Sequence, residues 1–293
     1  MITTNSPLLS VRNLNIDVAT GSGRSRVVSE VSFELRKGET VGIVGESGSG
    51  KSMTANAIMG ILPDVATATG TVQYDGTELL SLSSTKRRKM SGPGIGYIFQ
   101  EPMSALHPLL TIGEQMIRPL RYHLKLTKQE ASRRAADLLD QVGIPPSRGV
   151  LRSHIHELSG GMRQRVMIAM AISCQPRLLI ADEPTTALDA TVQKQILDLL
   201  VQLRDDMGLA LVLISHDLGL IAKYSDQVVV MLEGNVMEQG ATSQIIHSPA
   251  HPYTRGLMDA SPRLGQKQHR LPVIDKSKFT KLAPAASTST EEK

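Results

Sequence analysis

A glycine-rich stretch near the start of the chain has the residue types and spacing of a phosphate-binding loop. It comprises Gly45, Glu46, Ser47, Gly48, Ser49, Gly50, Lys51 and Ser52, which match the pattern G-x-x-x-x-G-K-[ST]. Glycines allow backbone N–H groups to turn inward around phosphate oxygens. The ammonium of Lys51 would reach the outer phosphates of a bound nucleoside triphosphate, and the hydroxyl of Ser52 would be a ligand of Mg²⁺.

The neighbours of this loop supply the context that the motif requires. Residues 40–44 are a short apolar run typical of a buried strand. Residues 53–59 predict a helix that ends at Gly60, and the amino end of such a helix attracts anions. A chance match to the loop pattern is expected in about one percent of chains of this length. A glycine-rich turn without function is therefore the weaker interpretation.

Further polar side chains come directly after apolar runs that predict buried strands. Asp182 and Glu183 follow residues 178–181, and His216 follows residues 211–215. In open α/β sheets the ligand site lies at the carboxyl ends of the strands. Asp182 is therefore a candidate Mg²⁺ ligand, and Glu183 could position or deprotonate an attacking water. His216 could hydrogen-bond the γ-phosphate, but its spacing alone is equally compatible with a structural role.

Ser159, Gly160 and Gly161 begin a predicted helix and form a second candidate anion site. Taken alone, this tripeptide is better explained as an ordinary helix cap. The two helix ends are far apart in the sequence, however, and one phosphate site needs only one of them. We therefore expect the second to serve a nucleotide that is bound mainly by another subunit.

The elements that must position these groups follow from the hydrophobic pattern. Residues 8–45 predict β structure because apolar and polar residues alternate, with one slip at Arg12-Asn13 that suggests a bulge. Residues 101–176 predict helices, and from residue 177 strands and helices alternate, which favours a largely parallel α/β sheet. Two capping-box patterns begin helices, Thr111 with Glu114 and Thr127 with Glu130. One buried helix face is predicted from the spacing of Ala131, Ala135, Leu138, Leu139 and Val142.

The composition limits the class of protein. The chain has 293 residues, of which 41% are hydrophobic and 20% charged, as in soluble globular proteins. We expect no membrane span, because no run of about 18 apolar residues is present. We also expect no secretion signal. Both expectations favour a cytoplasmic location. Cys174 is the one cysteine, which excludes a disulfide framework. The lack of Trp and the 3% aromatic content argue against a platform for single-stranded nucleic acid.

Together these motifs resemble those of the ATP-binding cassette (ABC) family of ATPases. The phosphate loop resembles the Walker A motif of that family, residues 178–183 its Walker B motif with the catalytic glutamate, and His216 its switch histidine. Residues 158–162 resemble its signature motif. Gln100 falls at the position of the family's Q-loop glutamine. The resemblance therefore implies that Gln100 contacts ATP and Mg²⁺. The resemblance covers residues 8–265.

The resemblance implies an α/β fold, with a P-loop NTPase core of the ABC type, an N-terminal antiparallel β subdomain and a helical subdomain. The β subdomain and first part of the core would occupy residues 8–100, the helical subdomain 101–176 and the second part of the core 177–240. The resemblance implies ATP and Mg²⁺ as cofactors, and Glu183 and His216 as catalytic residues. It also implies that two cassettes sandwich two ATP molecules, each between one Walker A loop and the signature helix of the other subunit.

A narrower resemblance is to the peptide/nickel importer branch of the family. Residues 45–52, 99–103 and 159–170 are similar to that branch. Residues 251–257 resemble its C-terminal His-Pro-Tyr motif, within an extension expected over residues 241–265. We expect residues 266–293 to form a flexible tail, since they are polar and rich in small residues.

The branch implies an ATP-hydrolysing subunit that energises the import of peptides or related solutes, including nickel chelates. It would lie at the cytoplasmic face of the inner membrane as a peripheral protein. Its partners would be a second ABC ATPase subunit, different or identical, two transmembrane permease subunits and an extracytoplasmic solute-binding protein, with no nucleic acid. Residues 101–120 would face the permease.

Two alternatives stay open at this point. The first is a soluble cassette ATPase that acts on ribosomes or DNA. Such forms usually carry two cassettes or a long coiled coil, and this sequence shows neither. The second is a non-catalytic partner subunit, against which the intact Glu183 and His216 argue. The transported solute does not touch this kind of subunit, so the sequence does not specify it.

Overall fold

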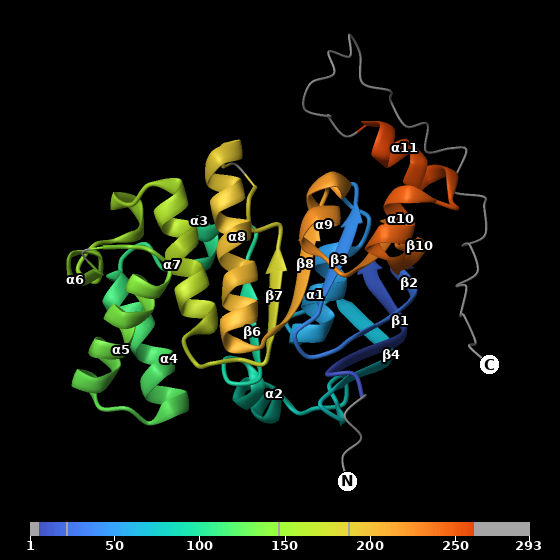
Figure 1. The fold of residues 1–293 in the computed structure, drawn as a ribbon. Coiled ribbons are helices and arrows are strands. Elements are labelled where there is room, and N and C mark those ends of the chain that lie inside the picture. The colour runs from blue at the N-terminus through green and yellow to red at the C-terminus, as the bar shows by residue number, and fades with distance from the viewer. Residues whose placement is uncertain (1–5, 22, 146, 187, 261–293) are drawn as a thin grey trace. The chain divides into compact units, whose positions relative to one another are not determined.

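The computed structural model describes residues 6–21, 23–145, 147–186 and 188–260, and Figure 1 shows the course of the chain. The chain divides into two compact units. Unit 1 is formed by residues 1–81 together with 212–293, and unit 2 by residues 82–211. The tail expected over residues 266–293 lies outside the described residues, as does the end of the expected extension.

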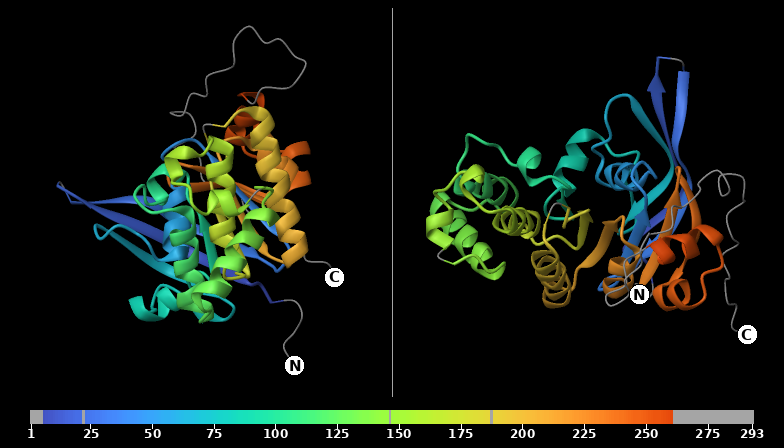
Figure 2. Two further views of the ribbon diagram at one scale, coloured as in Figure 1. Left: turned by 90° about the vertical axis from the view of Figure 1, so that its left-hand side faces the viewer. Right: turned by 90° about the horizontal axis from the view of Figure 1, so that it is seen from above.

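Unit 1 contains an antiparallel sheet in the order β2-β1-β4-β5. Its strands are β1 (Leu9–Thr20), β2 (Gly23–Leu35), β4 (Ala66–Tyr74) and β5 (Thr77–Glu78). The first two form a long hairpin (Figure 2). The register of β1 against β2 shifts between Val11 and Leu14, which confirms the bulge predicted from the alternation. The antiparallel β subdomain is thus present at the N-terminus.

A second sheet of unit 1 holds its strands in the order β10-β9-β3-β8. They are β3 (Thr40–Gly45), β8 (Ala210–Ser215), β9 (Gln227–Leu232) and β10 (Asn235–Ala241). All residues of β3 are buried, and β3 pairs in parallel with β9. The helices are α1 (Lys51–Met59), α9 (Leu218–Tyr224), α10 (Thr242–His247) and α11 (Pro252–Ala260). Helix α11 packs against α9 and β10 (Figure 1).

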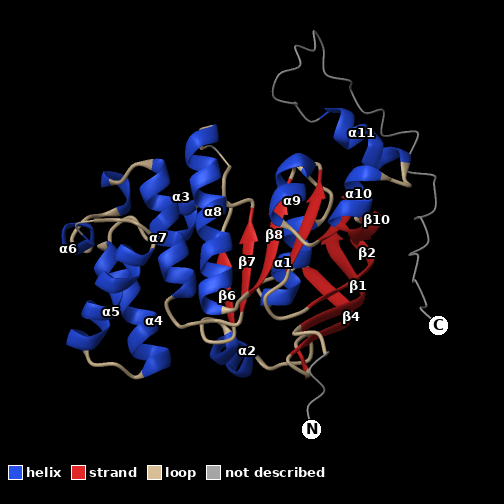
Figure 3. Cartoon of the chain, in the orientation of Figure 1, coloured by secondary structure: helices blue, strands red, loops and turns tan. Residues whose placement is uncertain are grey.

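Unit 2 consists mainly of helices (Figure 3). They are α2 (Ser84–Met90), α3 (Pro102–Ala105), α4 (Ile112–Leu124), α5 (Lys128–Gln141), α6 (Ser147–Val150), the 3₁₀ turn η1 (Ile155–Glu157), α7 (Gly160–Ile172) and α8 (Ala190–Met207). Two strands, β6 (Ile95–Ile98) and β7 (Leu178–Asp182), pair in parallel.

Both predicted capping boxes are confirmed, and they explain where α4 and α5 begin. The hydroxyl of Thr111 accepts a hydrogen bond from the backbone N–H of Glu114 at 3.2 Å, and that of Thr127 from Glu130 at 3.3 Å. In each pair the glutamate accepts in return from the backbone N–H of the threonine. The predicted helix face of α5 is fully buried, so local signals and tertiary packing agree here. None of the described helices combines the length and the apolar composition needed to cross a bilayer.

Candidate nucleotide site

The glycine-rich loop connects β3 to α1 in unit 1, as the sequence predicts. Gly50 occupies the N-cap of α1 with φ 95°, a backbone conformation that side chains rarely adopt. At Gly45 a Cβ atom would lie 2.2 Å from the carbonyl oxygen of Met231 on β9. These two positions therefore require glycine, one for its conformation and the other because a neighbouring strand lies too close.

Lys51 lies inside the loop rather than in solvent. Its side chain is only 4% exposed, and the ammonium donates hydrogen bonds to the carbonyl oxygens of Gly45 at 2.8 Å and Glu46 at 2.9 Å. A buried charge requires such partners. The side chain is thereby folded back over the loop.

The groups around this loop fit the phosphates of ATP and the Mg²⁺ that accompanies them. No side chain forms a capping hydrogen bond at the amino end of α1. The hydroxyl of Ser49 is buried and has no hydrogen-bond partner among the described residues. Ser52 lies partly buried in the first turn of α1. A cation, backbone N–H groups and hydroxyls are the chemistry that a triphosphate requires.

Gln100 and Glu183 meet in unit 2 because their strands are neighbours. The parallel register of β6 and β7 ends with Ile98 opposite Ala181, so the residues that follow both strands leave the sheet at the same edge. The amide of Gln100 donates to Oε2 of Glu183 at 3.0 Å. The hydroxyl of Thr186 donates to the same oxygen at 3.1 Å. Glu183 has φ 46°, a strained conformation that is typical of functional positions.

Asp182 is buried, with 5% of its surface exposed, and its carboxylate is oriented by Tyr97. The phenol of Tyr97 donates to Oδ2 of Asp182 at 3.1 Å. Burial, and after it the negative charge of Asp182, raise the pKa of Tyr97, so the phenol stays protonated and remains a donor. Within the described part of the chain no cluster of three or more His, Cys, Asp or Glu side chains could hold a metal ion. One carboxylate suffices for Mg²⁺ that is bound mainly through nucleotide phosphates and water.

Sequence reasoning missed Tyr97 and Thr186. The feature of the sequence that could have identified Tyr97 was its phenol hydroxyl within an otherwise apolar strand. Tyr97 lies opposite Ile180, and Asp182 lies two residues further along β7, on the same face of the sheet. This placement could not be read from the sequence, because the pairing of β6 with β7 is not a local property.

Ser159, Gly160 and Gly161 form the amino end of α7. Ser159 is the N-cap, and its hydroxyl accepts from the backbone N–H of Met162 at 3.4 Å. Ser159 and Gly160 are exposed. At Gly161 a Cβ atom would lie 2.9 Å from the Val192 side chain, so a larger residue would push α7 away from α8. The end of the helix is therefore kept open by small residues and can accept an anion from outside.

His216 follows β8 directly and is exposed. The turn after it is fixed, because the backbone N–H of Asp217 donates to the hydroxyl of Ser215 at 3.0 Å and Asp217 caps α9. Unit 1 thus contains the phosphate loop and His216, whereas unit 2 contains Gln100, the two acids and the signature residues.

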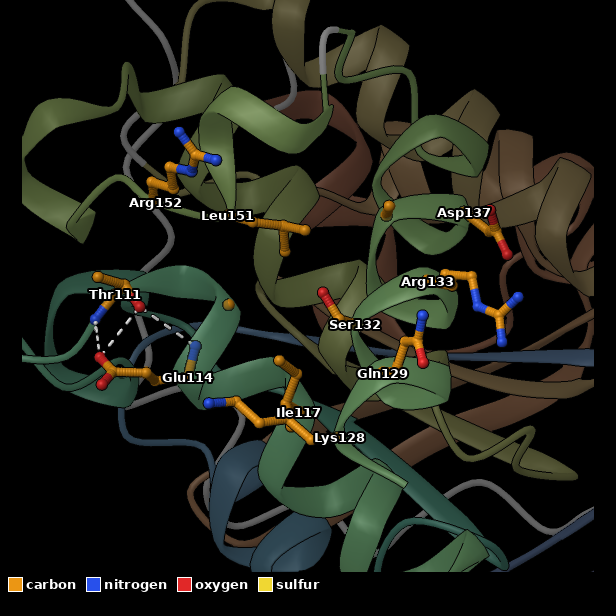
Figure 4. Close-up of a pocket in the computed structure, with 12 residues that line it drawn as sticks. Thr111, Glu114, Ile117, Lys128, Gln129, Ser132, Arg133, Asp137, Leu151 and Arg152 are labelled. Atoms are coloured by element: carbon orange, nitrogen blue, oxygen red, sulfur yellow. Dashed lines mark hydrogen bonds between the residues drawn. The ribbon is translucent and has the colours of Figure 1, made fainter. Parts of the chain in front are cut away.

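Unit 2 also has a cavity of about 850 Å³ between its helices. Figure 4 shows that α4 contributes Glu114 and Ile117 to it, and α5 contributes Lys128 and Arg133. Arg152 also lines the cavity and lies above Thr111 in the same view. Its lining carries charges of both signs beside apolar groups.

A phosphate loop between a buried strand and a helix, an acid pair after a second buried strand and an open, serine-capped helix define a P-loop ATPase of the cassette type. The comparisons with known proteins agree. The family described as ABC transporter matches residues 28–186, and the chain belongs to this family. The region described as "Oligopeptide/dipeptide transporter, C-terminal region" matches residues 237–285.

Relatives with curated names are also similar over most of this chain. The oligopeptide transport ATP-binding protein OppD of Haemophilus influenzae is 48% identical over 265 residues, which cover 90% of this chain and 82% of the relative. The glutathione import ATP-binding protein GsiA of Shigella dysenteriae is 45% identical over 97% of this chain. The chain spans only 47% of the length of GsiA.

A solved structure has the same fold. It is the dimeric post-hydrolysis state of the ATP-binding cassette MJ0796 bound to ADP and Pi, with a TM-score of 0.72 and 28% identity. The match covers 80% of this chain and 98% of that structure. The predicted fold class, an ABC-type P-loop core with antiparallel β and helical parts, is confirmed.

Proposed function

We propose that this chain hydrolyses ATP to energise the import of peptides or related solutes through an ABC transporter. The observation that carries the importer assignment is the C-terminal match over residues 237–285, which occurs together with a complete set of cassette motifs. The relatives named for oligopeptide, peptide and glutathione import support the same assignment. A cassette that acts on ribosomes or DNA is not favoured by any of these relatives.

We assign the nucleotide-binding role to the loop of residues 45–52. The ammonium of Lys51 would leave its carbonyl acceptors and bind phosphate oxygens, which are stronger acceptors because they are charged. Ser52, Gln100 and Asp182 would hold Mg²⁺, and the metal would supply neutralisation of the phosphate charge. Two observations support this assignment: Tyr97 holds a carboxylate oxygen of Asp182, and no side chain forms a capping hydrogen bond at the amino end of α1.

Glu183 would take a proton from the attacking water, and His216 would hydrogen-bond the γ-phosphate. Gln100 and Thr186 both donate to Oε2 of Glu183, and these hydrogen bonds would hold the carboxylate in place for its role as general base. Gln100 donates to Glu183, and we propose that it would also contact the metal.

Ser159, Gly160 and Gly161 would bind the ATP of a second cassette subunit, identical or different. The exposure of this helix end supports that proposal. We propose two permease subunits and an extracytoplasmic solute-binding protein as the other partners, with no nucleic acid, and a peripheral location at the cytoplasmic face of the inner membrane.

The proposed permease contact is the segment of residues 101–120. Leu109 is 79% exposed and Met103 43% exposed, so this segment offers large apolar side chains that a partner could cover. The cavity in Figure 4 begins in the same segment, at Thr111 and Glu114. We also keep residues 101–176 as the proposed helical subdomain, residues 8–100 and 177–240 as the proposed β and core parts, and 241–265 as the proposed extension.

The test is affinity purification of tagged Glu183→Gln protein from solubilised membranes in the presence of ATP, read by mass spectrometry. The amide cannot accept the proton, so hydrolysis should fall at least about 100-fold and the ATP-bound assembly should accumulate. The matched control is Asp205→Asn, a surface acid of the same unit whose side chain is 60% exposed.

We expect the Glu183→Gln protein, but not the control, to retain a second cassette subunit and two multispanning proteins. Normal hydrolysis by Glu183→Gln would refute the role of Glu183. Recovery of ribosomes or DNA-repair proteins without a membrane partner would overturn the importer assignment and leave the ATPase activity.

A further inference from the structure

Helix α2 of unit 2 carries a run of cations that the proposed nucleotide site does not use. Residues 86–89 are Lys, Arg, Arg and Lys, and none of the seven described residues of this helix is buried. Lys86, Arg88 and Lys89 are exposed. Cations in the last turn of a helix stabilise its negative end, which accounts for one or two of these residues but not for the whole run.

The carboxyl end of α4 lies beside this run. At Gly92, two residues after α2 ends, a Cβ atom would lie 3.3 Å from the imidazole of His123. Arg121 and Lys125 lie two residues to either side of His123 and are exposed. Both helix ends are found at the lower edge of unit 2 in Figure 1. We call the surface that they share the basic surface, and it comprises residues 86–89 of α2 with Arg121, Tyr122, Leu124 and Lys125.

The two segments that form the basic surface contain no acid. Residues 82–95 include four Lys or Arg residues and residues 115–126 include three, whereas neither range contains Asp or Glu. The acids that flank residues 115–126 in the sequence, Glu114 and Glu130, are held in the two capping boxes. Like charges that are brought together raise the free energy of the folded state. An anionic partner would lower it, so the basic surface is suited to such a partner.

Exposed apolar side chains among these cations indicate which kind of anionic partner fits. Tyr122 is 52% exposed and Leu124 is 39% exposed. The ammonium of Lys125 lies over the Tyr122 ring, 5.3 Å from its centroid, and the ring of His123 packs perpendicular to it at 4.7 Å. Both contacts compete with the stacking of a nucleic-acid base on Tyr122. Cations beside an aromatic and an aliphatic side chain are instead typical of surfaces that bind an anionic lipid bilayer.

We propose that the basic surface binds the anionic headgroups of a lipid bilayer. Its cations contact the phosphates of the headgroups, and Tyr122 and Leu124 enter the boundary between headgroups and acyl chains. The inference rests on the proposed location at the cytoplasmic face of the membrane, and it adds a contact with the lipid to the contact with the permease. It assigns a role to the basic run of α2, which the cassette motifs do not include.

The test measures sedimentation of the purified full chain with lipid vesicles that contain no permease. The vesicles are phosphatidylcholine alone, or phosphatidylcholine with about 30% anionic phosphatidylglycerol, and a mixed-sequence RNA is offered as a competitor. The variant that removes the basic run is Lys86→Gln/Arg88→Gln/Lys89→Gln. The matched control is Arg24→Gln/Lys37→Gln/Lys194→Gln, which removes three exposed cations outside the basic surface and lowers the net charge equally. The melting temperature and ATP hydrolysis in solution are measured for each protein.

We expect the wild-type chain to bind the anionic vesicles but not the neutral ones, and to bind more weakly as the salt concentration rises. A cation near an anionic surface contributes about fivefold to binding. The α2 variant should therefore bind about 100-fold more weakly, with unchanged ATP hydrolysis, whereas the control should change less than about threefold because its cations lie beyond the contact.

Two results would overturn the inference: no binding to anionic vesicles, or an equal loss in the α2 variant and the control, which would indicate an effect of net charge alone. Preferential binding of the RNA would overturn it as well and assign the surface to nucleic acid. Failure of the proposed function is distinguishable, because a chain that binds the vesicles but retains no permease subunits in the affinity purification would keep the lipid contact and lose the importer assignment.

Discussion

Removal of one phenol oxygen should test whether Asp182 is held ready for a metal ion. Tyr97 and Asp182 are 7% and 5% exposed, and their hydrogen bond is 3.1 Å long. A hydrogen bond to a charged group contributes about 1.5–3 kcal/mol. For a protein of this size, each kcal/mol corresponds to about 2–4 °C in Tm. Tyr97→Phe should therefore lower Tm by about 3 to 12 °C.

The same substitution should also change the response to Mg²⁺. Without the hydrogen bond from Tyr97, the carboxylate of Asp182 must be ordered by the metal ion itself. The Mg²⁺ concentration for half-maximal ATP hydrolysis should therefore rise about tenfold, which corresponds to about 1.4 kcal/mol of the lost interaction. The assay is phosphate release across a Mg²⁺ titration at saturating ATP. The control is Tyr122→Phe, whose ring is 52% exposed. A lower Tm with an unchanged Mg²⁺ response would show that Tyr97 stabilises the fold but does not prepare a metal site.

Two further predictions concern groups whose pKa is shifted by burial. Burial raises the pKa of the Cys174 thiol, so the native protein should react with a thiol reagent at pH 8 far more slowly than the protein in denaturant; equal rates would contradict its burial. Burial also lowers the pKa of His251 from 6.5, although the charge of Glu238 opposes this shift. Protonation of His251 therefore favours the unfolded state. The contribution of His251 to the free energy of unfolding is fully present above about pH 6.5 and is lost as the pH falls below that value toward the folded-state pKa. His251→Asn keeps an acceptor for the N–H of Tyr253 but does not titrate, so its Tm should fall less between pH 7.5 and 5.5, and an identical fall would refute the assignment.

Several features of the fold were predictable because their causes are local. The phosphate loop was identified with its strand and helix, and α1 ends at Gly60 as predicted. The capping boxes at Thr111 and Thr127 placed the starts of two helices correctly. Each of these signals depends on residues within one or two helical turns of one another, where steric and hydrogen-bonding rules act on the chain directly.

The contacts around the candidate catalytic groups were not predictable in the same way. The sequence placed Gln100 and Glu183 after two separate strands, but it did not show that Thr186 shares the carboxylate or that Tyr97 holds Asp182. Those contacts depend on the adjacent pairing of β6 and β7. The order of strands in a sheet is decided by the burial of whole surfaces, and no short stretch of sequence records it.

The His-Pro-Tyr segment shows the same division between local and tertiary information. The sequence by itself determined the chemistry of this protein: the loop that binds phosphates, the acids and histidine after apolar runs, and a C-terminal motif that identifies a branch of the family. Only the tertiary structure decided that this segment lies against β10, where the carboxylate of Glu238 accepts from the backbone N–H groups of Ala250 and His251. Motifs are constrained by the atoms they bind and so keep a fixed spacing, whereas packing brings together residues from distant parts of the chain because it must fill the interior of the fold.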